Sequence, residues 1–599
     1  MTKSPFFVGV LGALAWAAGI FVVRPTWAAA LLLLAPFVIV PMGLRLAATP
    51  NRDGRHPASY RAAVWLALPA AVSLMASFAM APSRLAGVLA FPWLGVTLLA
   101  AIFGARRVAQ RGVGPSEELC IDVALLFLAV GGAWGVLCRG FERPLGFDGL
   151  VATLTAVHFH YAGFTLCLFV GLAGRRMRNG APLLVVVSVI GGICALAAGI
   201  GARVMMLEQL AGWSLALGGC LVAAVHLHLA TSPGKPVFRL LIALSGLCLA
   251  GALVLGALFA ARSVLVVPWV ADLGHMAHFH GSANALGFAM LGAFAWSSAP
   301  ARPRVADPGI PFSALAARTH VGANFFERTG AADPEARAPR GLVDSLEEHR
   351  RPALATDRVH AAVRAFYERT ADHELVVTTR WRGAFRLAAR IFLAFARVMG
   401  QLELPLGGER DPDRVSSRLV ALDAAKDGRP GARGWVRTRA RRSTSHAGER
   451  ERAMYIAAYA THSYEGTAYM NIAFPLPFPF ANLTSILRMD PLDVGDDVLG
   501  VELTTRAPPR TPSDAGIWLV VRLFGALRLP LHETIRVWPT SARFAPHSIE
   551  TRELPGATAV ARHELRIFGV RYLTLDYLIR PLPLEARMAR ASFDSAFDA

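Results

Sequence analysis

The stretch that decides the fold is Leu265–Trp296, LVVPWVADLGHMAHFHGSANALGFAMLGAFAW. It is apolar over enough residues to cross a bilayer as a helix, which takes roughly 20 residues. It also carries Asp272, His275, His278 and His280. Imidazole and carboxylate groups inside a membrane span cost free energy, so they usually serve a function or hold a partner. The stretch therefore predicts a spanning helix with a polar site inside the membrane.

Similar apolar runs fill the first half of the chain, and short polar loops separate them. The first run is interpreted as a span rather than a cleaved signal peptide, because a second run follows it almost at once. We expect about ten spanning helices, over residues 5–23, 26–47, 60–81, 84–104, 118–138, 148–173, 181–206, 211–231, 238–260 and 265–297. The first half is thus predicted to be an α-helical polytopic membrane bundle.

The net charge of +19 comes almost wholly from arginine, since lysine occurs only at Lys3, Lys235 and Lys426. Loops after the even-numbered spans carry about twice as many basic residues as the other loops, and positive loops stay in the cytoplasm. Orientation explains the charge better than nucleic-acid binding does, because no zinc finger or basic helical stripe is visible. We therefore expect the lipid bilayer and no nucleic acid as partner. The predicted location is the bacterial inner (cytoplasmic) membrane, with both termini cytoplasmic.

The second half of the chain holds most of the charge and none of the six cysteines. Its folding needs no oxidising compartment, which agrees with a place in the cytoplasm. Residues 1–297 are the expected transmembrane helical domain, residues 298–350 a linker rich in Ala, Pro and Arg, and residues 351–599 a cytoplasmic β-rich domain.

Within that last domain, Asp357–Val398 predicts two helices, whereas the sequence from Ser417 onward alternates as strands do. The expected strands are Arg433–Arg441, Met454–Tyr459, Thr467–Phe474, Val498–Thr505, Gly516–Phe524, Glu533–Pro539, Ala559–Ile567 and Tyr572–Ile579. Phe474–Phe480 contains three prolines and is expected to be a loop or a sheet edge. The pattern predicts an α+β domain dominated by one antiparallel sheet or barrel.

A second histidine group lies in the sixth apolar run, where His158 and His160 are two residues apart. Side chains two apart on an α-helix point about 200° from one another, so such a pair cannot bind one ion on a single face. Both histidine groups lie near mid-span, so we expect spans six and ten to be neighbours with facing imidazoles. The candidate cofactor-binding residues are His158, His160, His275, His278 and His280, and the candidates that orient them are Asp272, Tyr161 and Asn284.

The chemistry of this group stays open, because no spacing in it is specific for one metal or for haem. Bound haem or a transition metal, a proton path and purely structural hydrogen bonds all fit it. Asp272 precedes His275 by three residues and is expected to hold its second ring nitrogen. His226 and His228 lie near the cytoplasmic end of the eighth run and are interpreted as an interfacial pair.

The second half shows no catalytic motif such as G-x-S-x-G or a P-loop. Three functions follow from the sequence. The first is binding or sensing of a lipophilic or cofactor ligand, the second is haem- or metal-dependent redox chemistry, and the third is transport along a histidine proton path. The sequence assigns no catalytic residue, no substrate and no oligomeric state.

Several segments occur in the same order as in one known family. They are Val157–Phe164, His280–Phe288, Asp427–Arg429, Trp435–Arg437, Tyr469–Ala473 with Pro475–Pro477, Asp514–Ile517 and Leu573–Tyr577. In these segments the chain resembles the YndJ-like bacterial membrane proteins. The resemblance implies one polytopic protein with a matching cytoplasmic domain, and it implies no activity.

A second resemblance is short. His158-Phe159-His160-Tyr161 is similar to the haem-ligating motif of haem–copper oxidase subunit I. Carried over, the motif would make His158 and His160 ligands of two different haems. The chain lacks the His-His dipeptide for copper and a clear earlier ligand helix, and it has fewer spans than the oxidases. We therefore reject an oxidase and keep haem or metal binding as a hypothesis.

Overall fold

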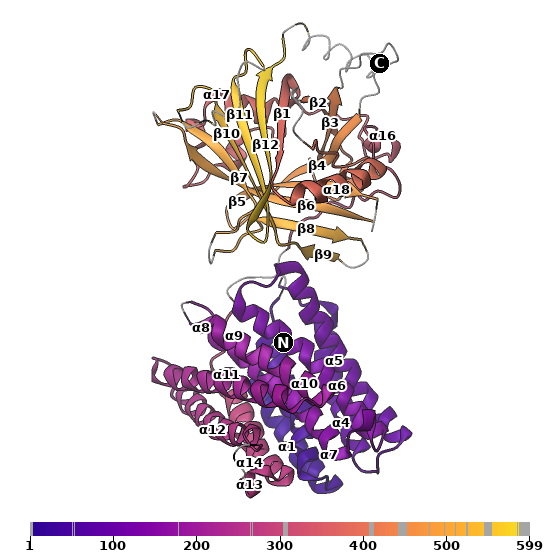
Figure 1. Ribbon diagram of the computed structural model, residues 1–599, viewed down its shortest axis with the longest axis vertical. Helices are drawn as coiled ribbons and strands as arrows, with labels where there is room; N and C mark the ends of the chain where they lie inside the picture. The colour runs from indigo at the N-terminus through magenta and orange to yellow at the C-terminus, as the bar shows by residue number, and fades with distance from the viewer. Residues whose placement is uncertain are drawn as a thin grey trace. The chain divides into compact units, whose positions relative to one another are not determined.

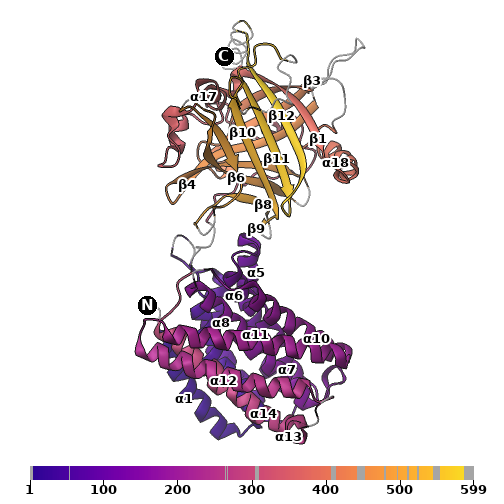
Figure 2. The same ribbon diagram turned by 60° about the vertical axis from the view of Figure 1, so that its left-hand side comes forward.

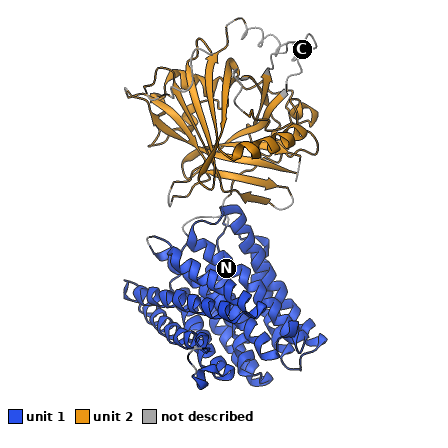
Figure 3. Cartoon of the chain, in the orientation of Figure 1, with its two compact units in different colours: residues 1–308 blue, residues 309–599 orange. Residues whose placement is uncertain are grey.

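The computed structural model divides the chain into two compact units, residues 1–308 and residues 309–599 (Figure 3). It describes residues 4–585 except 51, 53, 178, 264, 266, 304–308, 407–412, 441–451, 478, 479, 496, 509, 510, 523, 524, 544, 546–553 and 584. The first unit is helical and the second is built around a β-sheet (Figure 1). The expected linker falls across the division, and its residues from Gly309 onward lie in the second unit.

The first unit is a bundle of long apolar helices whose bounds lie close to the predicted runs (Figures 1 and 2). Among the described residues, nine helices are long and apolar enough to cross a membrane. Six are unbroken α-helices: α1 (Pro5–Val23), α4 (Ala58–Ser77), α5 (Arg84–Arg111), α6 (Ser116–Gly140), α11 (Met205–Thr231) and α12 (Pro236–Ala260). The predicted helical membrane bundle is confirmed.

The other three of these helices each contain a π-helical segment. They are α2 (Trp27–Leu34) with η1 (Ala35–Ile39) and α3 (Val40–Ala47), then α7 (Gly149–His158) with η3 (Phe159–Leu166) and α8 (Cys167–Arg176), then α9 (Leu183–Val186) with η4 (Val187–Gly191) and α10 (Gly192–Ala202). A π segment widens one turn of a helix and is frequent at functional sites.

The tenth expected span, which contains the histidine stretch, is also helical but is not among those nine. It begins with the short helix α13 (Pro268–Ala271). After Asp272 come α14 (Leu273–Ser282), η5 (Ala283–Met290) and α15 (Leu291–Ser298), and these three follow one another without a break. Its histidines and Asn284 make it more polar than the other spans. It packs beside the second span, where Trp27 Nε1 donates to Ser282 Oγ at 2.9 Å.

A buried ionic cluster ties three spans together at one end of the bundle. Glu118 accepts hydrogen bonds from Arg175 Nε and Nη2 at 2.6 and 2.8 Å, and from Arg107 Nη2 at 2.6 Å. Asp122 pairs with Arg107 Nε at 2.7 Å and with Arg111. All five side chains are buried. Three of the arginines that the sequence predicts as loop charges therefore lie inside the bundle, neutralised by carboxylates.

The second unit is an antiparallel barrel of ten strands in the described residues (Figure 2). The order around the ring is β5-β4-β3-β2-β1-β12-β11-β10-β7-β6, and β6 pairs with β5 to close it. The ring strands are β1 (His373–Trp381), β2 (Asp413–Ala421), β3 (Arg433–Ala440), β4 (Arg452–Tyr464), β5 (Thr467–Leu476), β6 (Ala481–Asp493), β7 (Leu499–Thr504), β10 (Leu531–Pro539), β11 (Ala559–Ile567) and β12 (Val570–Pro581). The predicted antiparallel sheet is confirmed, in the form of a closed barrel.

A hairpin continues the sheet outside the ring. It consists of β8 (Gly516–Val521), which pairs with the first half of β6, and β9 (Gly525–Arg528), which pairs with β8. The second half of β6 pairs with β7 instead. One long strand therefore serves both the ring and the hairpin.

The proline-rich stretch Phe474–Phe480, predicted to be a loop or a sheet edge, begins as a strand end that has one partner, and its residues 478 and 479 lie outside the described residues. Part of it is regular strand, since β5 continues through Pro475 to Leu476 and pairs there with β6. The pairing of β5 with its other neighbour, β4, ends at Ala473. A proline, which has no N–H to donate, is tolerated at Pro475 because that residue has a ladder partner on one side only.

Two short helices flank β1. The sequence predicts both of them, and they are α17 (Ala361–Glu368) and α18 (Phe385–Met399). The strand between them is not predicted, and it runs from one helix to the other, so the helices lie at opposite ends of β1. Val363, Phe366 and Tyr367 of α17 are buried in the barrel core.

Candidate functional site

The first unit encloses a cavity of about 500 Å³ that is lined mainly by apolar side chains from spans two, six, seven, eight, nine and ten. Its polar lining includes Thr155, His158, Tyr161, His280 and Asn284. Glu208 and Arg262 also line it and form an ion pair at 2.5 Å. Spans six and ten meet at their π segments, η3 and η5. Four of the eight residues that the sequence selects therefore line one cavity.

The two histidines in this cavity are both held through Nδ1. His158 Nδ1 donates to the carbonyl of Leu154 at 2.8 Å, and His280 Nδ1 donates to the carbonyl of Ala252 at 2.8 Å. In a neutral imidazole whose Nδ1 donates, Nε2 is an acceptor. His280 Nε2 accepts from Asn284 Nδ2 at 3.2 Å. The cavity thus presents hydrogen-bond acceptors to whatever enters it.

His160 lies on the other side of its helix and does not reach this cavity. It is wholly buried against α5, where Trp93 Nε1 donates to His160 Nε2 at 3.0 Å. Its Nδ1 donates to the carbonyl of Ala156 at 2.8 Å. A Cβ added at Gly131 would lie 2.7 Å from the His160 ring. Both ring nitrogens are satisfied and the site is fully packed, so His160 supports the bundle.

Replacing His160 by leucine will lower the melting temperature of the protein in detergent. The change leaves the buried Trp93 N–H without an acceptor, which costs about 1–3 kcal/mol. The matched control is His278→Leu, because His278 is exposed and stacks on Trp27 with ring centroids 5.4 Å apart. Equal melting temperatures for the two variants would contradict the structural role of His160.

The remaining candidates lie outside the cavity. His275 is exposed and stacks on Trp269 with ring centroids 5.5 Å apart. Asp272 caps the helix by accepting from the backbone N–H of His275 at 2.7 Å, whereas its carboxylate oxygen is 3.7 Å from His275 Nδ1. The carboxylate therefore orients the start of the helix rather than the imidazole.

His226, which the sequence analysis interprets as half of an interfacial pair, is a core residue of the bundle. It is wholly buried, with the rings of Phe169, Phe288 and Trp296 around it and Ser245 Oγ 3.3 Å from its Nδ1. Phe288 and Trp296 belong to span ten, so this histidine packs between spans eight and ten. Among the described residues, no group of three or more His, Cys, Asp or Glu side chains is arranged to hold a metal ion.

The second unit holds a larger cavity, of about 580 Å³, inside the barrel. The inward residues of each strand recur at every second position, as the pleat requires. On β10, β11 and β12 they include Ile535 and Val537, Ala561 and Leu565, and Leu573 and Leu575. The wall is mostly aliphatic and aromatic, and α18 forms part of it through Ala388, Ala389 and Phe392.

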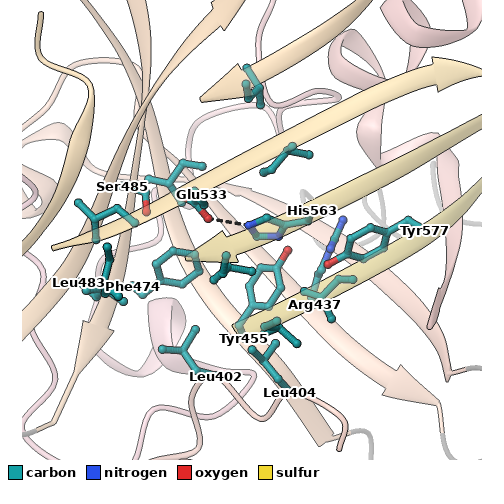
Figure 4. A pocket seen from close by; sticks show the side chains of 18 of the residues that line it. Leu402, Leu404, Arg437, Tyr455, Phe474, Leu483, Ser485, Glu533, His563 and Tyr577 are labelled. Carbon is teal, nitrogen blue, oxygen red and sulfur yellow. Dashed lines mark hydrogen bonds and ion pairs between the residues drawn. The ribbon is translucent and has the colours of Figure 1, made fainter. Parts of the chain in front are cut away.

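Arg437, a buried arginine, lines this apolar lumen (Figure 4). The guanidinium carbon of Arg437 lies 4.0 Å from the ring centre of Trp435, and 5.2 and 5.3 Å from those of Tyr455 and Tyr577. Both phenol groups interact with the guanidinium. Among the described residues no carboxylate lies within ion-pair distance of Arg437. In the part of the chain that the structure describes, the buried donors Arg437 Nε and Trp435 Nε1 have no acceptor.

A second polar group lies beside the arginine. His563 Nε2 and Glu533 Oε2 are 2.7 Å apart, and Ser485 also bonds to the Glu533 carboxylate (Figure 4). Burial alone raises the pKa of Glu533, but the bonds from His563 and Ser485 outweigh it and lower the pKa below the usual value. The carboxylate lies between serine and imidazole, whereas serine hydrolysis needs the imidazole in the middle. The arrangement therefore fits binding better than that chemistry.

Residues 30–288 match the model of the family described as YndJ-like protein. A protein of Bacillus subtilis (strain 168), described as uncharacterized membrane protein YndJ, is 27% identical over 504 residues, which cover 82% of this chain and 84% of the relative. The resemblance to the YndJ-like family is confirmed. No solved structure matches the chain.

Residues 30–288, which match that family model, contain the polar residues of spans six and ten that line the membrane cavity, among them His158 and His280. The alignment with the Bacillus YndJ protein is longer than the first unit, so it must also include residues of the barrel unit. The similarity therefore includes residues of both units. It assigns no activity, because the relative is described as uncharacterized.

Sequence reasoning missed the barrel site because each of its polar residues looks ordinary in its own strand. The signal that could have found it lies on β3, where Trp435 and Arg437 are two residues apart and so share one face. A strand face that carries tryptophan usually points to the core. The arginine beside it is then a buried cation.

Proposed function

We propose that the protein is a membrane-anchored receptor for an amphipathic molecule with one apolar chain and an anionic head group, which it binds inside the barrel. Arg437 carries the proposal. A cation buried in an apolar cavity costs free energy unless an anion or several acceptors satisfy it. The two tyrosine hydroxyls and the orphaned N–H groups of Arg437 and Trp435 give an incoming carboxylate or phosphate several donors at once.

The rest of the lumen supports an apolar chain as the other part of the ligand. A cavity of about 580 Å³ lies within the range of small-molecule sites, roughly 300–1,000 Å³. Each methylene group that moves from water into this wall contributes about 0.8 kcal/mol. The chain of the ligand therefore supplies most of the affinity, and the arginine selects the head group.

The experiment compares two ligands that differ only in the head group. The purified full-length chain in detergent is titrated with hexadecanoate and with hexadecanol, each competing with a fluorescent fatty acid. We expect hexadecanoate to bind at least 10-fold more tightly. Equal affinities, or no displacement of the probe by either compound, would remove the basis of the proposal.

We further propose an inner-membrane location with both termini in the cytoplasm. The support is the excess of basic residues in the loops after the even-numbered spans, together with a second unit that contains no cysteine. In this orientation the barrel samples ligands on the cytoplasmic side of the membrane.

The membrane cavity is proposed as a separate site for a neutral lipophilic molecule. His158 and Asn284 expose acceptors there, and the Glu208–Arg262 pair is already neutralised. A ligand with a hydroxyl or amide N–H fits these acceptors better than an anion does.

A further inference from the structure

The outer face of α18 is unusual for a helix on a water-soluble barrel. Only Ala389, Leu393 and Ala396 of this helix are buried. Leu387, Ile391, Phe395 and Val398 recur every three or four residues and are therefore on one face. Their side chains are 65%, 57%, 63% and 77% exposed. A contiguous apolar stripe of this kind on a surface marks a contact with a protein or a membrane.

The polar residues of α18 are all basic. Arg386, Arg390 and Arg397 are exposed, and the helix contains no acidic residue. An amphipathic helix with arginines beside an apolar face is the form that lies in the head-group region of an anionic bilayer. A second copy of the same face would instead bring like charges together, which disfavours self-association.

The apolar surface continues beyond the helix. Phe568 and Val570, at the turn between β11 and β12, are 79% and 56% exposed. This turn lies at the same end of the barrel as the start of α18, because Phe385 contacts Tyr572 with ring centres 5.7 Å apart. A helix and a turn together give a broader apolar surface than the helix alone.

We infer that α18 docks into the surface of an anionic bilayer and forms the side of the barrel through which a lipid chain enters the lumen. The occupant of this face is the bilayer to which the first unit anchors the chain, so the effective concentration of the partner is high. Ala388 and Phe392 lie in the lumen wall and are also exposed, so one helix separates the cavity from the outside. The entry route rests on the proposed function, whereas the docking does not.

The docking is tested in the full-length chain, reconstituted into vesicles that contain phosphatidylglycerol. A photoreactive benzophenone amino acid replaces Ile391 in one variant and Asp357 in the other. Asp357 is the matched control, because it is exposed and lies near α17, at the opposite end of β1 from α18. We expect lipid adducts at position 391 and none at position 357, with fewer adducts in vesicles of phosphatidylcholine alone. Equal adduct yields, or chain-to-chain crosslinks at position 391, would overturn the docking.

The entry route is tested with Ile391→Glu, whose exposed position should tolerate the change. Transfer of a fluorescent fatty acid from vesicles into the protein is expected to slow at least 10-fold, with the equilibrium affinity in detergent within 2-fold of the parent. Asp357→Asn should change neither. An unchanged transfer rate would overturn the route. If the parent protein binds no fatty acid at all, the proposed function fails, and the adducts still decide the docking.

Discussion

Replacing Arg437 by methionine will remove the preference of the barrel for an anionic ligand. Truncating one partner of a buried charge pair costs about 2–5 kcal/mol, because the carboxylate of the ligand then enters an apolar lumen without a counter-charge. The affinity for hexadecanoate should fall roughly 30-fold to a few thousand-fold. The affinity for hexadecanol should stay within a few-fold, since the apolar wall is unchanged. Competition titration with the same fluorescent probe measures both.

The fold itself should survive this substitution. Exchanging a buried charged side chain for an apolar one of similar volume is often neutral or stabilising, so the melting temperature should not fall. Arg418→Met is the matched control, because Arg418 lies half-exposed on β2 and pairs with Glu327 outside the lumen. A parallel loss of hexadecanol binding would show that the lumen had collapsed. Unchanged hexadecanoate binding would mean that Arg437 does not contact the head group.

Replacing Glu118 by glutamine will destabilise the membrane unit strongly. Glu118 is the acceptor for both Arg107 and Arg175, and the same arginines donate to the carbonyls of Ala47 and Leu46 at the end of α3. Removing its charge takes away the carboxylate that these two buried guanidinium groups share. Breaking a buried ion pair on one side costs about 3–5 kcal/mol. We expect the melting temperature in detergent to fall by roughly 5–15 °C.

The control for this variant is Glu208→Gln. Glu208 also pairs with an arginine, Arg262, but both side chains are about a quarter exposed. A partly hydrated pair contributes about 0–1 kcal/mol, so this variant should melt within about 2 °C of the parent. Similar losses for the two variants would show that burial does not set the strength of the cluster.

The architecture of the first unit could be predicted because span length and composition are local properties of the chain. The expected run 238–260 and the observed helix Pro236–Ala260 differ by two residues at one end, so the sequence alone locates this span. The ion cluster was beyond prediction, since Arg107 and Arg175 read as loop charges until their helices are packed. Their carboxylate partners lie in a different span from either arginine.

In the barrel, the local pattern predicts many of the strands but not how they pair. Eight strands could be predicted from alternation, whereas β1, β2, β6 and β9 were missed. In β6, Thr484 and Ser485 interrupt the apolar pattern. Closure depends on pairings such as β5 with β6 and β1 with β12, and the second joins strands far apart in the sequence. Residue type alone selected the histidines of spans six and ten, and only packing shows that His158 and His280 share a cavity.

The closure of the ring has a consequence for biosynthesis. β1 ends at Trp381 and its partner β12 begins at Val570, so about 190 residues separate them. At a translation rate of about 5–20 residues per second, the ribosome needs roughly 10–40 s to make that interval. During this time β1 has one unpaired edge. The helix that follows it, α18, has already left the exit tunnel with its apolar face exposed. The nascent chain is thus most vulnerable to aggregation before the last strand appears, and a slower ribosome prolongs that risk.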